Sequence, residues 1–127
     1  MEANTQYQFW IDSAQDDLQS AEDMLTIKRY NWALFVGHLA LEKLLKAKYV
    51  LKFNEHPPKT HNLLMLIEKL ELEISKDEKL FLMMVNKFNI EARYAEYKRD
   101  FDKICTKEFA ETNFQKIKEI FQCLMNK

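Results

Sequence analysis

The sequence is almost without glycine and proline, since its 127 residues include one Gly and two Pro. Hairpins and tight turns depend on Gly, Pro and Asn, so this scarcity disfavours a fold rich in β-strands. Ala, Leu, Lys, Glu and Met are abundant, and these residues have high helix propensity. We therefore expect an all-α protein, and the length favours a single domain over residues 1–127.

Apolar residues recur at steps of three and four along the first half of the chain, which is typical of amphipathic helices. The pattern predicts one helix over residues 4–27 and a second over 31–53, with Asn31 as the N-cap of the second. Pro57–Pro58 ends this second helix. A short third helix is then predicted with Thr60 as its N-cap.

The second half begins with a clear helix-start signal, the capping box Ser75–Glu78. It predicts a fourth helix through about Asn89. Residues 90–105 have the weakest periodicity and are interpreted as a loop or partial helix. Thr106 is a predicted cap for the last helix. Together these elements predict an antiparallel up-and-down bundle of four long helices and one short helix.

The predicted helix over residues 31–53 is more apolar than one neighbouring helix would require. Leu34, Leu41 and Leu45 widen its apolar face, which indicates either a central position in the bundle or a homodimer interface. Gly37 lies in the middle of this helix, where Gly costs about 1 kcal/mol relative to Ala. We expect another helix to approach closely at that point.

Charge, hydropathy and cysteine content restrict the partners and the location, and the cysteines favour the cytoplasm. The formal net charge is −1, so the chain as a whole does not attract nucleic acid, although a local basic patch is compatible with this value. No apolar run reaches the roughly 18 residues that a membrane span needs, so we expect no membrane association. Cys105 and Cys123 are isolated and are expected to be free thiols.

Three polar residues, His38, Glu42 and Lys46, interrupt the apolar helix at four-residue steps and therefore share one face. One interpretation is a solvated stripe containing a Glu–Lys ion pair worth about 0.2–0.5 kcal/mol. The other is a polar seam at the mouth of a groove. In that case Lys43 and Lys46 would meet phosphate and His38 would exchange a proton near neutral pH.

The weakly periodic segment contains a second candidate site. Arg93 is one of only three arginines, and Tyr94 and Tyr97 lie beside it. A guanidinium binds phosphate through a planar fork, and aromatic rings stack on bases, so this segment could hold a nucleotide. The alternative is that Arg93 pairs with a helix acid and Tyr94 fills the core. If the bundle brings them together, a phosphate could bridge Lys46 and Arg93.

Other chemistries have no support in the sequence. The chain has no Glu-x-x-His motif and no Cys–His spacing suited to zinc, so we expect no metal site. It also has no Gly-rich phosphate loop and no nucleophile elbow. We therefore assign no catalytic residue and no cofactor.

The order of these motifs resembles the HEPN domain family (higher eukaryotes and prokaryotes nucleotide-binding). The segments "WIDSAQDDLQSAEDML", "YNWALFVGHLALEKLLKAKYV", "KTHNLLMLIEKL" and "EARYAEYK" are similar to the family's helical motifs. His38 stands where Gln is usual and Ala95 where Pro is usual. The matching polar residues are Glu42, Lys43, Lys46, His61 and Arg93.

The resemblance implies an all-α bundle, frequently a homodimer, with a role in RNA or nucleotide metabolism. It further implies a nucleotidyltransferase partner in a two-gene module, sometimes of toxin–antitoxin type. Many members are metal-independent ribonucleases with an Arg followed four to six residues later by His, and this chain lacks that spacing. We therefore expect a non-catalytic module that binds a nucleotide, RNA or a partner, with Glu42, Lys43, Lys46, His61, Arg93 and Tyr94 as the ligand-binding residues. The alternatives are a divergent ribonuclease using His61 or His38, and a structural helical adaptor.

Overall fold

The centre of the molecule is a long helix, α2 (Tyr30–Phe53), which contacts every other helix. The computed structural model describes residues 2–127, and this part of the chain forms six helices. The other five are α1 (Ala3–Thr26), α3 (Leu63–Leu70), α4 (Lys76–Arg93), α5 (Ala95–Ile104) and α6 (Lys107–Met125). Of the two interpretations of its wide apolar face, the structure thus agrees with a central position in the bundle.

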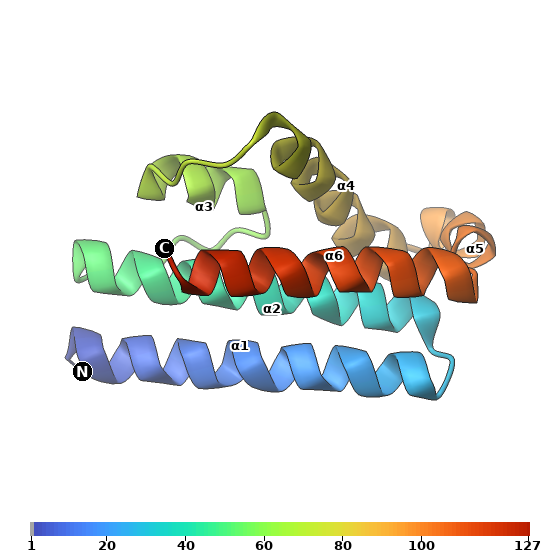
Figure 1. The fold of residues 1–127 in the computed structure, drawn as a ribbon, viewed down its shortest axis with the longest axis horizontal. Helices are drawn as coiled ribbons and strands as arrows, with labels where there is room; N and C mark the ends of the chain where they lie inside the picture. Colours follow the sequence, from blue (N-terminus) through green and yellow to red (C-terminus); the bar gives the residue numbers. More distant parts are fainter. Residues whose placement is uncertain (1) are drawn as a thin grey trace.

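The helices form an all-α bundle around α2 (Figure 1). Helices α1 and α2 lie antiparallel, whereas α6 begins at the same end of the molecule as α2 and runs in the same direction. Helix α4 lies obliquely across this group, and α3 and α5 are short. The bundle is therefore not uniformly up-and-down. Within residues 2–127, no helix combines the length and the apolar character needed to cross a membrane.

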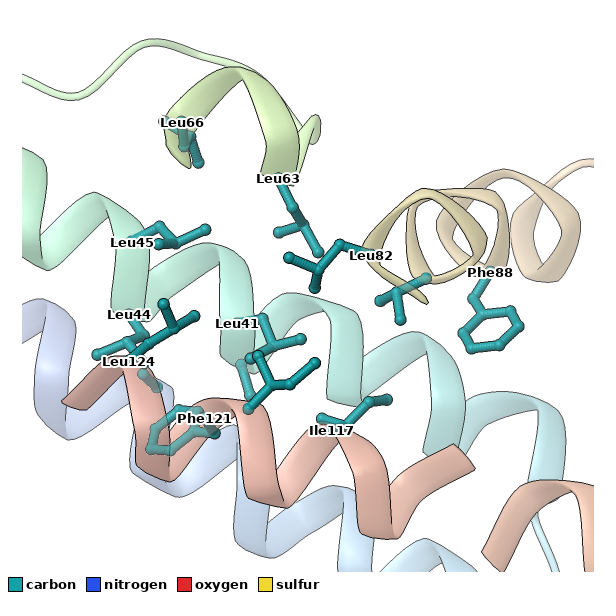
Figure 2. Packing of buried hydrophobic residues seen from close by; sticks show 14 of the residues in the cluster. Leu41, Leu44, Leu45, Leu63, Leu66, Leu82, Phe88, Ile117, Phe121 and Leu124 are labelled. Atoms are coloured by element: carbon teal, nitrogen blue, oxygen red, sulfur yellow. The ribbon is translucent and has the colours of Figure 1, made fainter. Parts of the chain in front are cut away.

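Large apolar side chains from four helices fill the core between α2, α3, α4 and α6 (Figure 2). Leu41, Leu44 and Leu45 of α2 are fully buried there. Helix α6 approaches α2 closely at Gly37, where a Cβ atom would lie 2.9 Å from Cδ1 of Ile117. The close approach expected at this glycine is confirmed, because the missing side chain lets α6 pack against the backbone of α2.

Two of the predicted caps are confirmed and two are wrong. Ser75 and Glu78 form the capping box of α4, and the Thr106 side chain accepts a hydrogen bond from the backbone N–H of Phe109. Asn31 is not a cap, because α2 already begins at Tyr30 after a sharp turn in which Lys28 has a φ of 65°.

Thr60 does not cap α3. The N-cap is Asn62, whose side chain accepts hydrogen bonds from two backbone N–H groups, and the Thr60 hydroxyl accepts one from the N–H of Asn62. His61 consequently lies in the loop just before the helix.

The predicted count of four long helices and one short helix is also wrong, because residues 90–104 are helical apart from Tyr94. Helix α4 continues to Arg93, and α5 follows after an extended residue, Tyr94 (ψ 129°). Phe101 is the only buried residue of α5. A helix fixed by one apolar anchor gives too sparse a pattern for periodicity to detect.

Candidate functional site

The polar stripe on α2 is buried. His38 is fully buried, and Glu42 and Lys46 are 5% and 8% exposed. The solvated-stripe interpretation is therefore wrong. Buried charged groups are retained only when they are paired and hydrogen-bonded, so the partners of these side chains indicate what the stripe does.

Glu42 is the centre of a buried ionic group. Lys46 donates from Nζ to one carboxylate oxygen at 2.9 Å, and Nδ1 of His61 lies 2.8 Å from the other. A carboxylate can only accept, so Nδ1 of His61 carries a hydrogen and donates to Glu42. The His61 side chain is 55% exposed. With Nδ1 engaged, Nε2 is the ring nitrogen left to meet a ligand.

Arg93 is held at the end of α4 by two hydrogen bonds to one residue. Its Nε donates to the backbone carbonyl of Asn89 at 3.1 Å, and Nη2 donates to Oδ1 of Asn89 at 2.9 Å. The Arg93 guanidinium carbon also lies 5.2 Å from the centre of the Tyr94 ring, within the range of a cation–π contact. The guanidinium is thus restricted in orientation although the residue is exposed to solvent.

His38 lies between these two groups. Its Nε2 is 2.8 Å from the backbone carbonyl of His61, and its Nδ1 is 3.4 Å from Nδ2 of Asn89. Burial lowers the pKa of His38 below its ordinary value of 6.5, although the hydrogen bond to the His61 carbonyl and the nearby Glu42 carboxylate oppose this effect. The ring is therefore neutral at pH 7.

His61 and Arg93 open onto one pocket of about 350 Å³ between the loop before α3 and the C-terminal half of α4. Asn86 connects its two walls, because Asn86 Oδ1 accepts from the N–H of Leu63 and Nδ2 donates to Oδ1 of Asn62. The lining residues are Thr60, His61, Asn62, Asn86, Asn89, Ile90 and Arg93. The pocket is lined by an imidazole, a guanidinium and the side-chain amides of three asparagines. These groups can donate hydrogen bonds, so the pocket suits a ligand with anionic oxygens.

The structure brings some of the predicted site residues together and separates others. Glu42, His61 and Arg93 belong to one connected set of hydrogen bonds. Lys46 joins this set only through Glu42 and is not among the residues that line the pocket. Lys43 faces α1 instead, where its Nζ lies 2.8 Å from both the Ser13 hydroxyl and the Asp17 carboxylate.

The asparagines were missed by the sequence analysis. Asn89 is 2% exposed and lies on the buried face of α4 with Val85 and Ala92. An amide at a core position of an amphipathic helix is a usable signal, because such a group requires a partner. The structure contains no cluster of three or more His, Cys, Asp or Glu side chains within residues 2–127 that could hold a metal ion.

Comparisons with known proteins identify both a family and a fold. The family model described as "HEPN domain" matches residues 7–127. The crystal structure of TT1696 from Thermus thermophilus is similar, with a TM-score of 0.80 and 20% sequence identity, over 94% of this chain and 96% of that one. At this identity the likeness shows the fold alone. Comparison with curated protein sequences gave no match.

Proposed function

Because the chain belongs to the HEPN domain family, we propose that it is a non-catalytic module that binds the phosphate of a nucleotide or RNA in the pocket lined by His61 and Arg93. The observation that supports this proposal is that His61 and Arg93, whose side-chain types are suited to phosphate, line one pocket and are held by hydrogen bonds to Glu42 and Asn89. Charge-assisted hydrogen bonds to phosphate are about twice as strong as neutral ones.

The aromatic residues beside Arg93 support a nucleotide rather than an inorganic anion. Tyr94 and Tyr97 are about half exposed, although side chains of this size are usually more deeply buried. A base that stacks on an exposed aromatic ring gains about 1–3 kcal/mol. A phosphate held by Arg93 would leave the attached nucleoside near the Tyr94 ring, whose centre lies 5.2 Å from the Arg93 guanidinium carbon.

Isothermal titration with mononucleotides and a short single-stranded RNA tests the proposal. The wild-type protein should bind, and Arg93→Ala should weaken binding roughly tenfold to a hundredfold, because a hydrogen bond to a charged group is worth about 1.5–3 kcal/mol. Arg29→Ala is the matched control, since Arg29 is an exposed arginine in the turn before α2. It removes the same charge without touching the pocket. Equal weakening by both variants, or no heat with any ligand, would refute the proposal.

A second candidate, a metal-independent ribonuclease, is favoured by the contact between His61 and Glu42. A carboxylate that fixes the tautomer of a half-exposed imidazole is the arrangement used by many general bases. His38 does not suit this role, because it is fully buried and both ring nitrogens are engaged. Cleavage of labelled RNA in EDTA by the wild-type protein, lost in His61→Ala, would establish this activity. Our proposal predicts binding without cleavage.

We also propose that the chain forms a homodimer, and that a nucleotidyltransferase is its partner in a toxin–antitoxin-like pair. Leu80, Met83 and Ile90 support an interface on α4, because they are 45–54% exposed and recur at helical spacing along it. Light scattering should give the dimer mass, and Met83→Lys should shift the protein towards monomer. A monomeric wild-type protein would refute the homodimer.

A further inference from the structure

One buried side chain contacts both walls of the pocket without lining it. His38 is fully buried on α2, and its two ring nitrogens face two different elements, the loop before α3 and helix α4. The first element carries His61 and the second carries Arg93. We propose that His38 is a positioning residue that holds His61 and Arg93 at a fixed separation. This inference rests on the proposed function, because it concerns the same pocket.

The hydrogen-bond directions around His38 are fixed by chemistry. A carbonyl oxygen can only accept, so Nε2 of His38 carries the hydrogen and donates to His61. The neutral ring then has an unprotonated Nδ1, which accepts from Nδ2 of Asn89. The other end of the Asn89 amide, Oδ1, accepts from Arg93, which sets the amide orientation independently.

The result is one directed chain of hydrogen bonds that runs from Arg93 through Asn89 and His38 to the His61 backbone. His61 is held a second time at its ring by Glu42. Loss of the His38 ring would leave the His61 carbonyl and the Asn89 amide without this shared partner, and each wall could then move separately. A site that must hold one phosphate from both sides depends on that separation.

Two variants separate positioning from space filling. His38→Leu fills the space of the ring with an apolar side chain and removes both hydrogen bonds. His38→Gln retains one donor and one acceptor. Asn113→Leu is the control for loss of a buried polar group, because Asn113 is 5% exposed on α6 and bonds to the Phe109 carbonyl. It lies outside the set of hydrogen bonds around the pocket.

The first readout is the dissociation constant for the mononucleotide that binds wild-type protein most tightly. We expect His38→Leu to weaken binding roughly tenfold, His38→Gln to restore most of it, and Asn113→Leu to leave it unchanged. The second readout needs no ligand. The Arg93 Nη2–H signal in NMR spectra should exchange faster with water in His38→Leu and recover in His38→Gln, because Nη2 donates to the Asn89 side chain that His38 orients.

The outcomes distinguish this inference from the proposed function. Unchanged binding and unchanged Arg93 exchange in His38→Leu would overturn the positioning role while leaving the phosphate site intact. A wild-type protein that binds no nucleotide would refute the proposed function, and the Arg93 signal would then decide the positioning role alone. If His38→Leu does not fold, the NMR signals of the His38 ring nitrogens in the wild-type protein still test the inference. His38 must be protonated on Nε2 and unprotonated on Nδ1, and the opposite tautomer would overturn the inference.

Discussion

Gly37 lies at the contact between α2 and α6. We expect Gly37→Ala to destabilise the wild-type protein and to stabilise the Ile117→Val variant. Gly37→Ala adds a Cβ atom that would lie 2.9 Å from Cδ1 of Ile117, well inside ordinary van der Waals contact. Ile117 is fully buried, so its terminal methyl group has little room to move. The next contacts, at 3.5 Å to Cγ2 of Ile117 and 3.9 Å to Phe114, are normal.

Two effects oppose each other in Gly37→Ala. Replacing Gly with Ala inside a helix gains about 1 kcal/mol, whereas overpacking a core costs about 1–3 kcal/mol. We therefore expect a net loss of up to about 2 kcal/mol. Ile117→Val removes the clashing methyl group and by itself costs about 0.5–1.5 kcal/mol. In the Ile117→Val background, Gly37→Ala should stabilise the protein by about 1 kcal/mol.

Urea unfolding of the wild-type protein, both single variants and the double variant measures these values as a double-mutant cycle. The expected coupling between the two sites is about 1–3 kcal/mol, set by the removed overpacking cost. Additive effects, or a stabilising Gly37→Ala in the wild-type background, would refute the claim that α6 packs directly against the α2 backbone.

Three further predictions concern the buried polar groups and the thiols. Glu42→Ala should lower the free energy of unfolding by about 3–5 kcal/mol in urea melts, because it leaves the Lys46 ammonium buried without its carboxylate. Burial lowers the pKa of His38 below 6.5. Just below that pH the unfolded chain therefore binds a proton at His38, whereas the native protein does not. Stability should therefore fall as the pH drops below 6.5, by up to about 1.4 kcal/mol per pH unit, and His38→Gln should lose this part of the pH dependence in melts. Burial, with nearby carboxylates, raises the pKa of Cys105 to about 12, so a thiol reagent at pH 8 should modify exposed Cys123 quickly and Cys105 only on unfolding.

Much of the fold could be predicted from local pattern alone. The amphipathic repeats, the Ser75 capping box and the apolar excess of α2 each depend on a few neighbouring residues, and the structure agrees with them. The direction of α6 could not be predicted in this way. It depends on the length of α5 and on the turn at Tyr94, and α5 has too few apolar anchors to be recognised as a helix.

The candidate site was only partly predictable for a related reason. The spacing of His38 and Glu42 placed them on one face of a helix, but spacing does not determine whether that face meets water or another element. The loop before α3 covers this face and brings in His61, a contact between residues 19 positions apart. Asn89 supplies the link to Arg93, and its place on the apolar face of α4 indicates that it needs a partner without identifying that partner.

The most direct test of the central claim is NMR titration of the isotope-labelled protein with a mononucleotide. If His61 and Arg93 hold the phosphate together, the largest backbone amide shifts should fall in two separate segments, residues 60–62 and 86–94, with the same affinity for both. Shifts confined to one segment, shifts centred on another face of the bundle, or no shifts at saturating ligand would contradict the account.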